Sequence, residues 1–149
     1  MLDSFGFIFL LSQRFEYITD QVLAGDNLTT KQLLALIAIE QGFEGPPSIS
    51  QVAEVLSTTH QNVKKLALQL EKKGFIEIYK DEQDRRRSLL KTTQKNRDYW
   101  DSRAAEHLEA IQKLFSSLSN EEIRKFAILL NKLLEGVDVI HRDRRKSMN

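Results

Sequence analysis

Apolar residues recur with the period of an α-helix along most of the chain. The first such stretch runs from about Asp3 to Leu23, and Gly25 follows it as a stop signal. Its continuous apolar run, residues 5–11, is far shorter than the roughly 20 residues of a membrane span. No basic residue precedes the run and no small-residue cleavage site follows it, so a signal peptide is not expected. We expect a buried first helix and a cytoplasmic protein without a membrane partner.

Two helices should follow, one long and one short. Thr29 and Gln32 have the spacing of a capping box and open a helix that extends to Gln41. This helix is apolar nearly all round, so we expect it to be central and buried. After a break rich in Gly and Pro, Ser50 is expected to cap a short helix over residues 51–56.

A polar turn over residues 57–59 separates the short helix from a fourth one, which should end at Gly74. Glycine suits the left-handed residue that terminates many helices, and the two lysines before it suit the negative end of the helix dipole. One face of this fourth helix is apolar at helical spacing and is expected to point inward: Val63, Leu66, Ala67 and Leu70.

An alternating segment interrupts the helical period and predicts a β-hairpin. Residues 75–80 and 88–92 have the pattern of two strands. Residues 81–87 between them are too polar to be anything but an exposed loop.

Two long helices complete the chain. Thr92 or Thr93 is expected to open the first, and Ser119 with Glu122 forms a capping box for the second. This order of elements predicts a mainly α protein with a small β-hairpin wing, in which a winged helix-turn-helix lobe is joined to long helices. We therefore divide the single chain, 1–149, into a winged helix-turn-helix DNA-binding lobe over 29–93 and a helical dimerisation lobe made of 1–28 and 94–149.

The nearly neutral composition conceals a segregation of charge. The chain has 22 basic and 21 acidic side chains, a net charge of +1. Residues 1–59 contain 2 basic and 7 acidic side chains, a net charge of −5, whereas residues 60–91 contain 9 and 5, a net charge of +4. Residues 92–149 contain 11 and 9, a net charge of +2. The basic excess therefore falls on the fourth helix and the hairpin.

The sequence gives no indication of catalysis. The absence of cysteine excludes a disulfide framework, thiolate catalysis and a cysteine redox switch. There is no glycine-rich phosphate loop, no His-Glu-x-x-His motif and no nucleophile elbow, and the three histidines, His60, His107 and His141, are widely separated. We expect no enzyme activity, no cofactor and no metal site.

The outward face of the fourth helix carries side chains suited to a DNA groove. Opposite its apolar face lie Gln61, Lys65, Leu68 and Lys72. Glutamine can pair with adenine, and lysine with guanine or a phosphate. An ordinary solvated helix carries similar side chains, so the helix alone leaves both interpretations open. The candidate contacts of this recognition helix are Thr58, Thr59, His60, Gln61, Asn62, Lys64 and Lys65.

Three consecutive arginines near the hairpin tip favour DNA binding. Crowding Arg85, Arg86 and Arg87 together is costly, and arginine suits the narrow, negatively charged minor groove. Asp84 is expected to hold one guanidinium in an ion pair within the loop. We take these four residues as the candidate wing contacts. The alternative is a winged helix that only binds other proteins, which would not need this concentration of positive charge.

These segments resemble the DNA-binding lobe of the MarR family of transcription regulators. The matching pieces are residues 70–76, Leu-Glu-Lys-Lys-Gly-Phe-Ile, and a wing signature in which Asp84 and Arg86 precede a strand that closes at Thr93. The flanking helices fit the family's order, so the resemblance covers essentially the whole chain. Three residues differ from those common at their positions in the family: Thr92 (usually Leu), Asn96 (often Gly) and His60 (often Arg).

The resemblance implies a homodimer that binds a pseudo-palindromic operator in double-stranded DNA, usually as a repressor that a small-molecule effector releases. The chain itself supports dimerisation, because the aromatic first helix and the two long last helices offer more apolar surface than one chain can bury. In the family, ligands lodge between the dimer helices and the DNA-binding lobe. Arg14, Phe15 and Trp100 are therefore candidate pocket residues.

Overall fold

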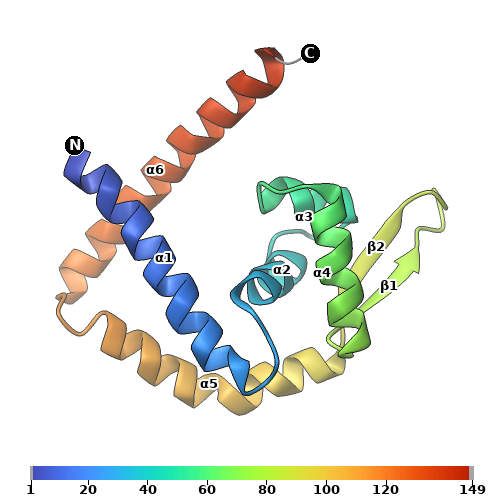
Figure 1. The fold of residues 1–149 in the computed structure, drawn as a ribbon, viewed down its shortest axis with the longest axis horizontal. Coiled ribbons are helices and arrows are strands. Elements are labelled where there is room, and N and C mark those ends of the chain that lie inside the picture. The colour runs from blue at the N-terminus through green and yellow to red at the C-terminus, as the bar shows by residue number, and fades with distance from the viewer. Residues whose placement is uncertain (1, 148–149) are drawn as a thin grey trace. The chain divides into compact units, whose positions relative to one another are not determined.

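The structure is a computed structural model that describes residues 2–147, and within them it contains six helices and one antiparallel hairpin (Figure 1). The elements follow the order α1 (Leu2–Ala24), α2 (Thr30–Gln41), α3 (Ile49–Val55), α4 (His60–Lys72), β1 (Ile76–Lys80), β2 (Ser88–Thr92), α5 (Gln94–Leu114) and α6 (Asn120–Ser147). The predicted fold class, mainly α with a hairpin wing, is confirmed. The chain forms two compact units, Met1–Asp101 and Ser102–Asn149, and α5 spans the boundary.

The core of the first unit lies between α2, α3, α4 and the hairpin. Its most deeply buried apolar side chains, none more than 1% exposed, are Leu36, Val52, Val63, Leu70, Ile76 and Leu90. The inward face predicted for α4 is confirmed, since Val63, Ala67 and Leu70 are buried and Leu66 packs against the core. Burial of this face leaves the opposite face of α4 in solvent.

The expected burial of the first two helices is only partly correct. In α2, Leu36 and Ile39 are buried, but Leu34 is 47% and Ile37 is 42% exposed. In α1, Leu23 is buried, while Phe7, near the other end, is 66% exposed. The prediction of a buried first helix is therefore wrong for the single chain, because the first unit covers only the C-terminal end of α1.

Side-chain caps fix where the short helices of the first unit begin. Ser48, rather than the expected Ser50, caps α3. The Ser48 backbone N–H donates to Gln51 Oε1 at 2.9 Å, and the Gln51 N–H donates to Ser48 Oγ at 3.3 Å. This reciprocal capping box explains the error, because it requires a polar side chain three residues after the cap. Thr29 caps α2 and Thr59 caps α4.

The wing is anchored to the segment that precedes α3. In the hairpin, Ile78 pairs with Leu90 and Lys80 pairs with Ser88. The Leu90 N–H also donates to the Pro47 carbonyl at 2.9 Å, and Leu89 forms an isolated bridge with Ser48. The hairpin is therefore hydrogen-bonded to the helix-turn-helix along β2, and is not connected to it only through its two ends.

The second unit contains the later part of α5 and the whole of α6. The predicted capping box at the start of α6 is confirmed, since Ser119 N–H donates to Glu122 Oε2 at 2.8 Å and Glu122 N–H donates back to Ser119 Oγ at 3.3 Å. The Ser119 backbone N–H and the Ser119 hydroxyl both donate to the Glu122 carboxylate, and these two hydrogen bonds lower the pKa of Glu122. Among the residues that the structure describes, no helix is both long and apolar enough to cross a membrane.

Candidate nucleic-acid interface

The first turn of α4 is held by its own polar side chains. The Asn62 backbone N–H donates to Thr59 Oγ1 at 3.2 Å, and the Asn62 side-chain amide donates to Thr58 Oγ1 at 3.1 Å. Three of the predicted contacts, Thr58, Thr59 and Asn62, therefore have a structural role at the helix start. His60 and Gln61 lie in the same turn and are exposed. The unpaired N–H groups of such a helix end attract anions.

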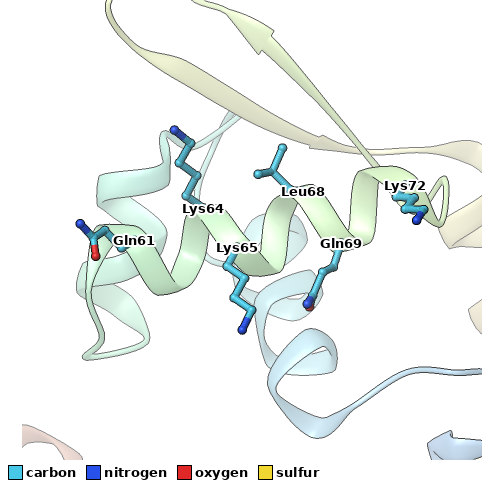
Figure 2. A pocket seen from close by; sticks show the side chains of 6 residues that line it. All are labelled: Gln61, Lys64, Lys65, Leu68, Gln69 and Lys72. Atoms are coloured by element: carbon cyan, nitrogen blue, oxygen red, sulfur yellow. The ribbon is translucent and has the colours of Figure 1, made fainter.

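The exposed face of α4 forms a shallow, open hollow of about 440 Å³, lined by Gln61, Lys64, Lys65, Leu68, Gln69 and Lys72 (Figure 2). Figure 2 shows Lys64 and Leu68 leaving one side of the helix and Lys65 and Gln69 leaving the other. The predicted outward face is therefore correct. Ammonium and amide groups spread along one open helix face suit a long polyanion better than an enclosed small molecule.

Gln69 is a residue of this face that the sequence did not single out. Its side-chain oxygen accepts a hydrogen bond from Gln32 Nε2 at 2.9 Å. Lys73 Nζ in turn donates to Gln32 Oε1 at 2.9 Å and to the Asn27 carbonyl. Desolvation lowers the pKa of Lys73. These polar contacts hold the end of α4 against α2. The signal for them in the sequence is Gln32, a polar residue within a mainly apolar helix.

The wing tip differs from the prediction in how its charges pair. Asp84 Oδ1 accepts from the Arg86 backbone N–H at 3.0 Å, and the Asp84 carbonyl accepts from the Arg87 N–H at 2.8 Å. The expected ion pair from Asp84 to a guanidinium is therefore wrong, because this carboxylate caps the turn instead. In the described loop the ion pair joins Arg87 to Asp81, at 3.9 Å.

The three arginines consequently have different surroundings. Arg87 Nη2 also donates to Gln51 Oε1, at 3.4 Å, which turns this side chain toward the start of α3. Arg85 and Arg86 are exposed at the tip. The first unit thus presents two cationic surfaces, the lysine-rich face of α4 and the tip of the wing. No cluster of three or more potential metal ligands occurs among the described residues.

The three candidate pocket residues lie on two helices. Arg14 and Phe15 are exposed on α1, and Phe15 is 37% exposed. Trp100 lies near the start of α5 and is packed against the core, where its indole N–H donates to Asn96 Oδ1 at 2.9 Å. Packing and this hydrogen bond explain the position of Trp100 without a ligand. The ligand pocket at these three residues stays a prediction.

Comparison with known proteins supports a specific family. Residues 26–87 match the family model of the MarR family. The transcriptional repressor MprA of Escherichia coli (strain K12) is 25% identical over 124 residues, which cover 83% of this chain and 70% of that protein.

Solved structures agree in fold. The S. aureus MepR–DNA complex matches with a TM-score of 0.74 at 26% sequence identity, covering 89% of this chain and 97% of that one. A MarR protein from Peptoclostridium difficile matches with a TM-score of 0.79 at 21% identity, covering 91% and 87%, and supports the fold alone. The helix-turn-helix, the anchored wing and these relatives agree: the chain is similar to the MarR family over residues 26–87 in sequence, and over most of its length in fold.

Proposed function

We propose that this protein is a sequence-specific DNA-binding transcription regulator. The observation that carries the proposal is the exposed face of α4, on which Gln61, Lys64 and Lys65 lie in solvent. The wing of the same unit adds exposed arginines. The α4 side chains would read and grip the major groove, and Arg85 and Arg86 would enter the adjacent minor groove. The relatives include a transcriptional repressor and a protein solved in complex with DNA, and the family is one of regulators rather than enzymes.

Selection of bound fragments from the source genome tests this function. Purified protein should enrich fragments that share one pseudo-palindromic site, with half-sites centred about 10 bp or a multiple of it apart. Variants that replace Gln61 and Lys65 by alanine should lose this enrichment while remaining folded. Recovery of unrelated fragments, or the same fragments with both variants, would contradict the proposal.

The homodimer is part of the same proposal. Apolar side chains are exposed on α1 of the first unit, including Phe5, Phe7 and Phe9, and on α6 of the second, including Leu134 and Val137. Exposed apolar area of this extent is uncommon in a stable monomer. A second copy of the chain would cover it and would bring two α4 helices to one palindromic operator.

Repression, its release by a small-molecule effector, and action in the cytoplasm complete the proposal. The repressor role is supported by the similarity to MprA. The effector would bind near Arg14, Phe15 and Trp100 and would act by preferring one conformation of the dimer. A thermal-shift screen of aromatic acids and amphiphiles, followed by DNA release by each compound that binds, tests this part of the proposal.

A further inference from the structure

Asn96 is a buried polar residue that the proposed DNA contacts do not use. It lies in the first turn of α5 and its side chain is fully buried, with 0% exposure. Its backbone N–H donates to Thr93 Oγ1 at 3.3 Å, and the Thr93 hydroxyl donates to the Gly74 carbonyl at 2.7 Å. The start of α5 is thereby tied to the end of α4. A buried amide in such a place requires partners for both its ends.

Both ends of the Asn96 amide have partners on different helices. Its Nδ2 donates to Glu40 Oε2 at 2.8 Å, in the last turn of α2, and its Oδ1 accepts from Trp100 Nε1 at 2.9 Å, in α5. An indole N–H only donates and a carboxylate only accepts. A side chain that joins them must therefore offer one acceptor and one donor, which an amide does. We call Glu40, Asn96 and Trp100 the amide bridge.

Aromatic packing extends the amide bridge to the rest of the first unit. The Trp100 ring contacts the Tyr99 ring edge-on, with centroids 4.7 Å apart, and Tyr99 contacts Phe75 in the same way at 5.3 Å. The Tyr99 hydroxyl donates to Asp26 Oδ2 at 2.9 Å, in the turn between α1 and α2. The first two turns of α5 are therefore held to α2, to that turn and to the start of β1.

We infer that Asn96 is a positioning residue for DNA recognition, which sets the direction in which α5 leaves the winged helix-turn-helix. This role rests on the proposed function, because it requires a dimer that binds DNA through two α4 helices. The α5 helix continues into the second unit, and the proposed dimer includes the C-terminal helix of that unit. A fixed direction of α5 fixes the separation of the two α4 helices, and hence the spacing of half-sites that the dimer accepts. Without the bridge, the α4 helices would adopt a wider range of separations.

The dependence of affinity on half-site spacing tests this role. Wild type and variants are titrated with the selected operator and with the same operator carrying one extra base pair between its half-sites. The insertion should weaken wild-type binding by about tenfold or more, the loss expected when one half-site no longer meets its base contacts. We call the ratio of the two affinities the spacing penalty. Asn96→Ala and Glu40→Ala should each lower this ratio by about fivefold, the factor that corresponds to the free energy of one net hydrogen bond.

Two variants serve as matched controls. Glu40→Gln keeps an oxygen that can accept from Asn96 and should retain the wild-type penalty. Glu44→Ala removes the same charge from the exposed loop after α2 and should also behave as wild type. Trp100 is the only tryptophan of the chain, so its fluorescence reports on the amide bridge directly. Its emission should shift to longer wavelength in Asn96→Ala and stay unchanged in Glu44→Ala.

The outcomes separate this role from the proposed function. If folded Asn96→Ala shows the fluorescence shift but keeps the wild-type spacing penalty, the residue is only structural and the inference is wrong. If wild type binds no selected site at all, the proposed function and the positioning role fail together. A penalty reduced equally by Glu44→Ala would also overturn the inference, because loss of charge alone would then explain it.

Discussion

The three wing arginines differ in what their side chains contact in the free chain. All three side chains are exposed, but Arg87 contacts Asp81 and Gln51. A guanidinium that already has partners gains less from a phosphate than one in open solvent. We therefore propose that Arg85 and Arg86 contact DNA, whereas Arg87 orients the wing.

Replacement of Arg86 and Arg87 by alanine tests this division. Arg86→Ala should weaken operator binding by about 10- to 100-fold and leave the dimer folded, because it removes a groove contact. Arg87→Ala should weaken binding less and keep the wild-type salt dependence, because it loosens the wing without removing a phosphate contact. Fluorescence anisotropy at several salt concentrations measures both effects. A larger loss for Arg87→Ala would contradict the assignment.

Two left-handed residues close the turns on either side of the recognition helix. Ser57 has φ of 49° and Gly74 has φ of 78°. In both turns the next N–H bonds a carbonyl five residues back, since Thr58 N–H donates to Ala53 O and Phe75 N–H to Leu70 O. Both turns thus have the same backbone conformation. At residue 74 it is adopted by glycine, which favours it, and at residue 57 by a serine, whose Cβ makes the left-handed conformation less favourable.

This difference predicts stability changes of opposite sign. Ser57→Gly should raise the free energy of unfolding by about 0.5–1 kcal/mol, because it relieves the left-handed strain. Gly74→Ala should lower it by about 1–2 kcal/mol for the same reason. The new Cβ would meet Lys95 Cδ at 3.4 Å, an ordinary contact, so the loss would come from the backbone. Urea denaturation followed by circular dichroism measures both, and a stabilising Gly74→Ala would refute the account.

At the scale of elements, local signals predicted most of the helices and the hairpin. Capping spacing, glycine stops and alternation are properties of a few neighbouring residues, and they placed α4, β2 and the start of α6 correctly. The start of α3 was missed because Ser48 and Ser50 are equally good caps alone, and only the partner Gln51 distinguishes them.

Contacts between elements were not predictable in the same way. The Arg87–Gln51 contact joins residues 36 positions apart, and the Asn96–Glu40 contact joins residues 56 apart. Sequence patterns carry information about the local period and the exposed face, but a long-range partner depends on how elements pack. The candidate contacts on α4 could therefore be placed on the right face, whereas the pairing of charges in the wing could not.

The Asp20 carboxylate contributes to the junction of α1 and α2. The Thr30 backbone N–H donates to Asp20 Oδ1 at 2.6 Å. This hydrogen bond, with the Thr30 side chain and the charge of Lys31, lowers the pKa of Asp20. Because the pKa of Asp20 is lower in the folded protein, the ionised carboxylate stabilises the fold at pH values above its unfolded-state pKa, near 4. This stabilisation is lost as the pH falls through the folded-state pKa.

Asp20→Asn should therefore lower the melting temperature at pH 7. The difference from wild type should shrink as the pH falls below about 4, where the wild-type carboxylate is protonated. Thermal denaturation at a series of pH values measures it, with Asp3→Asn, an exposed carboxylate at the other end of α1, as the matched control. A difference that does not change with pH would show that the charge of Asp20 is not responsible.

At the scale of the whole molecule, the apolar residues of α1 and α6 require an explanation that the single chain does not provide. Leu2 is 82% exposed and Leu134 is 61% exposed. A homodimer that covers these faces predicts a mass twice that of the chain in analytical ultracentrifugation. Phe7→Glu should shift the protein toward the monomer, because it would bury a charge in the interface. Gln13→Glu, an exposed change on the same helix, should not.

The salt dependence of operator affinity tests the central claim, DNA recognition by α4 and the wing, most directly. The cations that we propose to contact DNA are all exposed: Lys64, Lys65 and Lys72 on α4, with Arg85 and Arg86 on the wing. If two copies of this set neutralise phosphates, the logarithm of the association constant should fall with the logarithm of salt concentration with a slope steeper than about −4. An affinity that changes by less than about twofold between 50 and 200 mM salt would contradict the account.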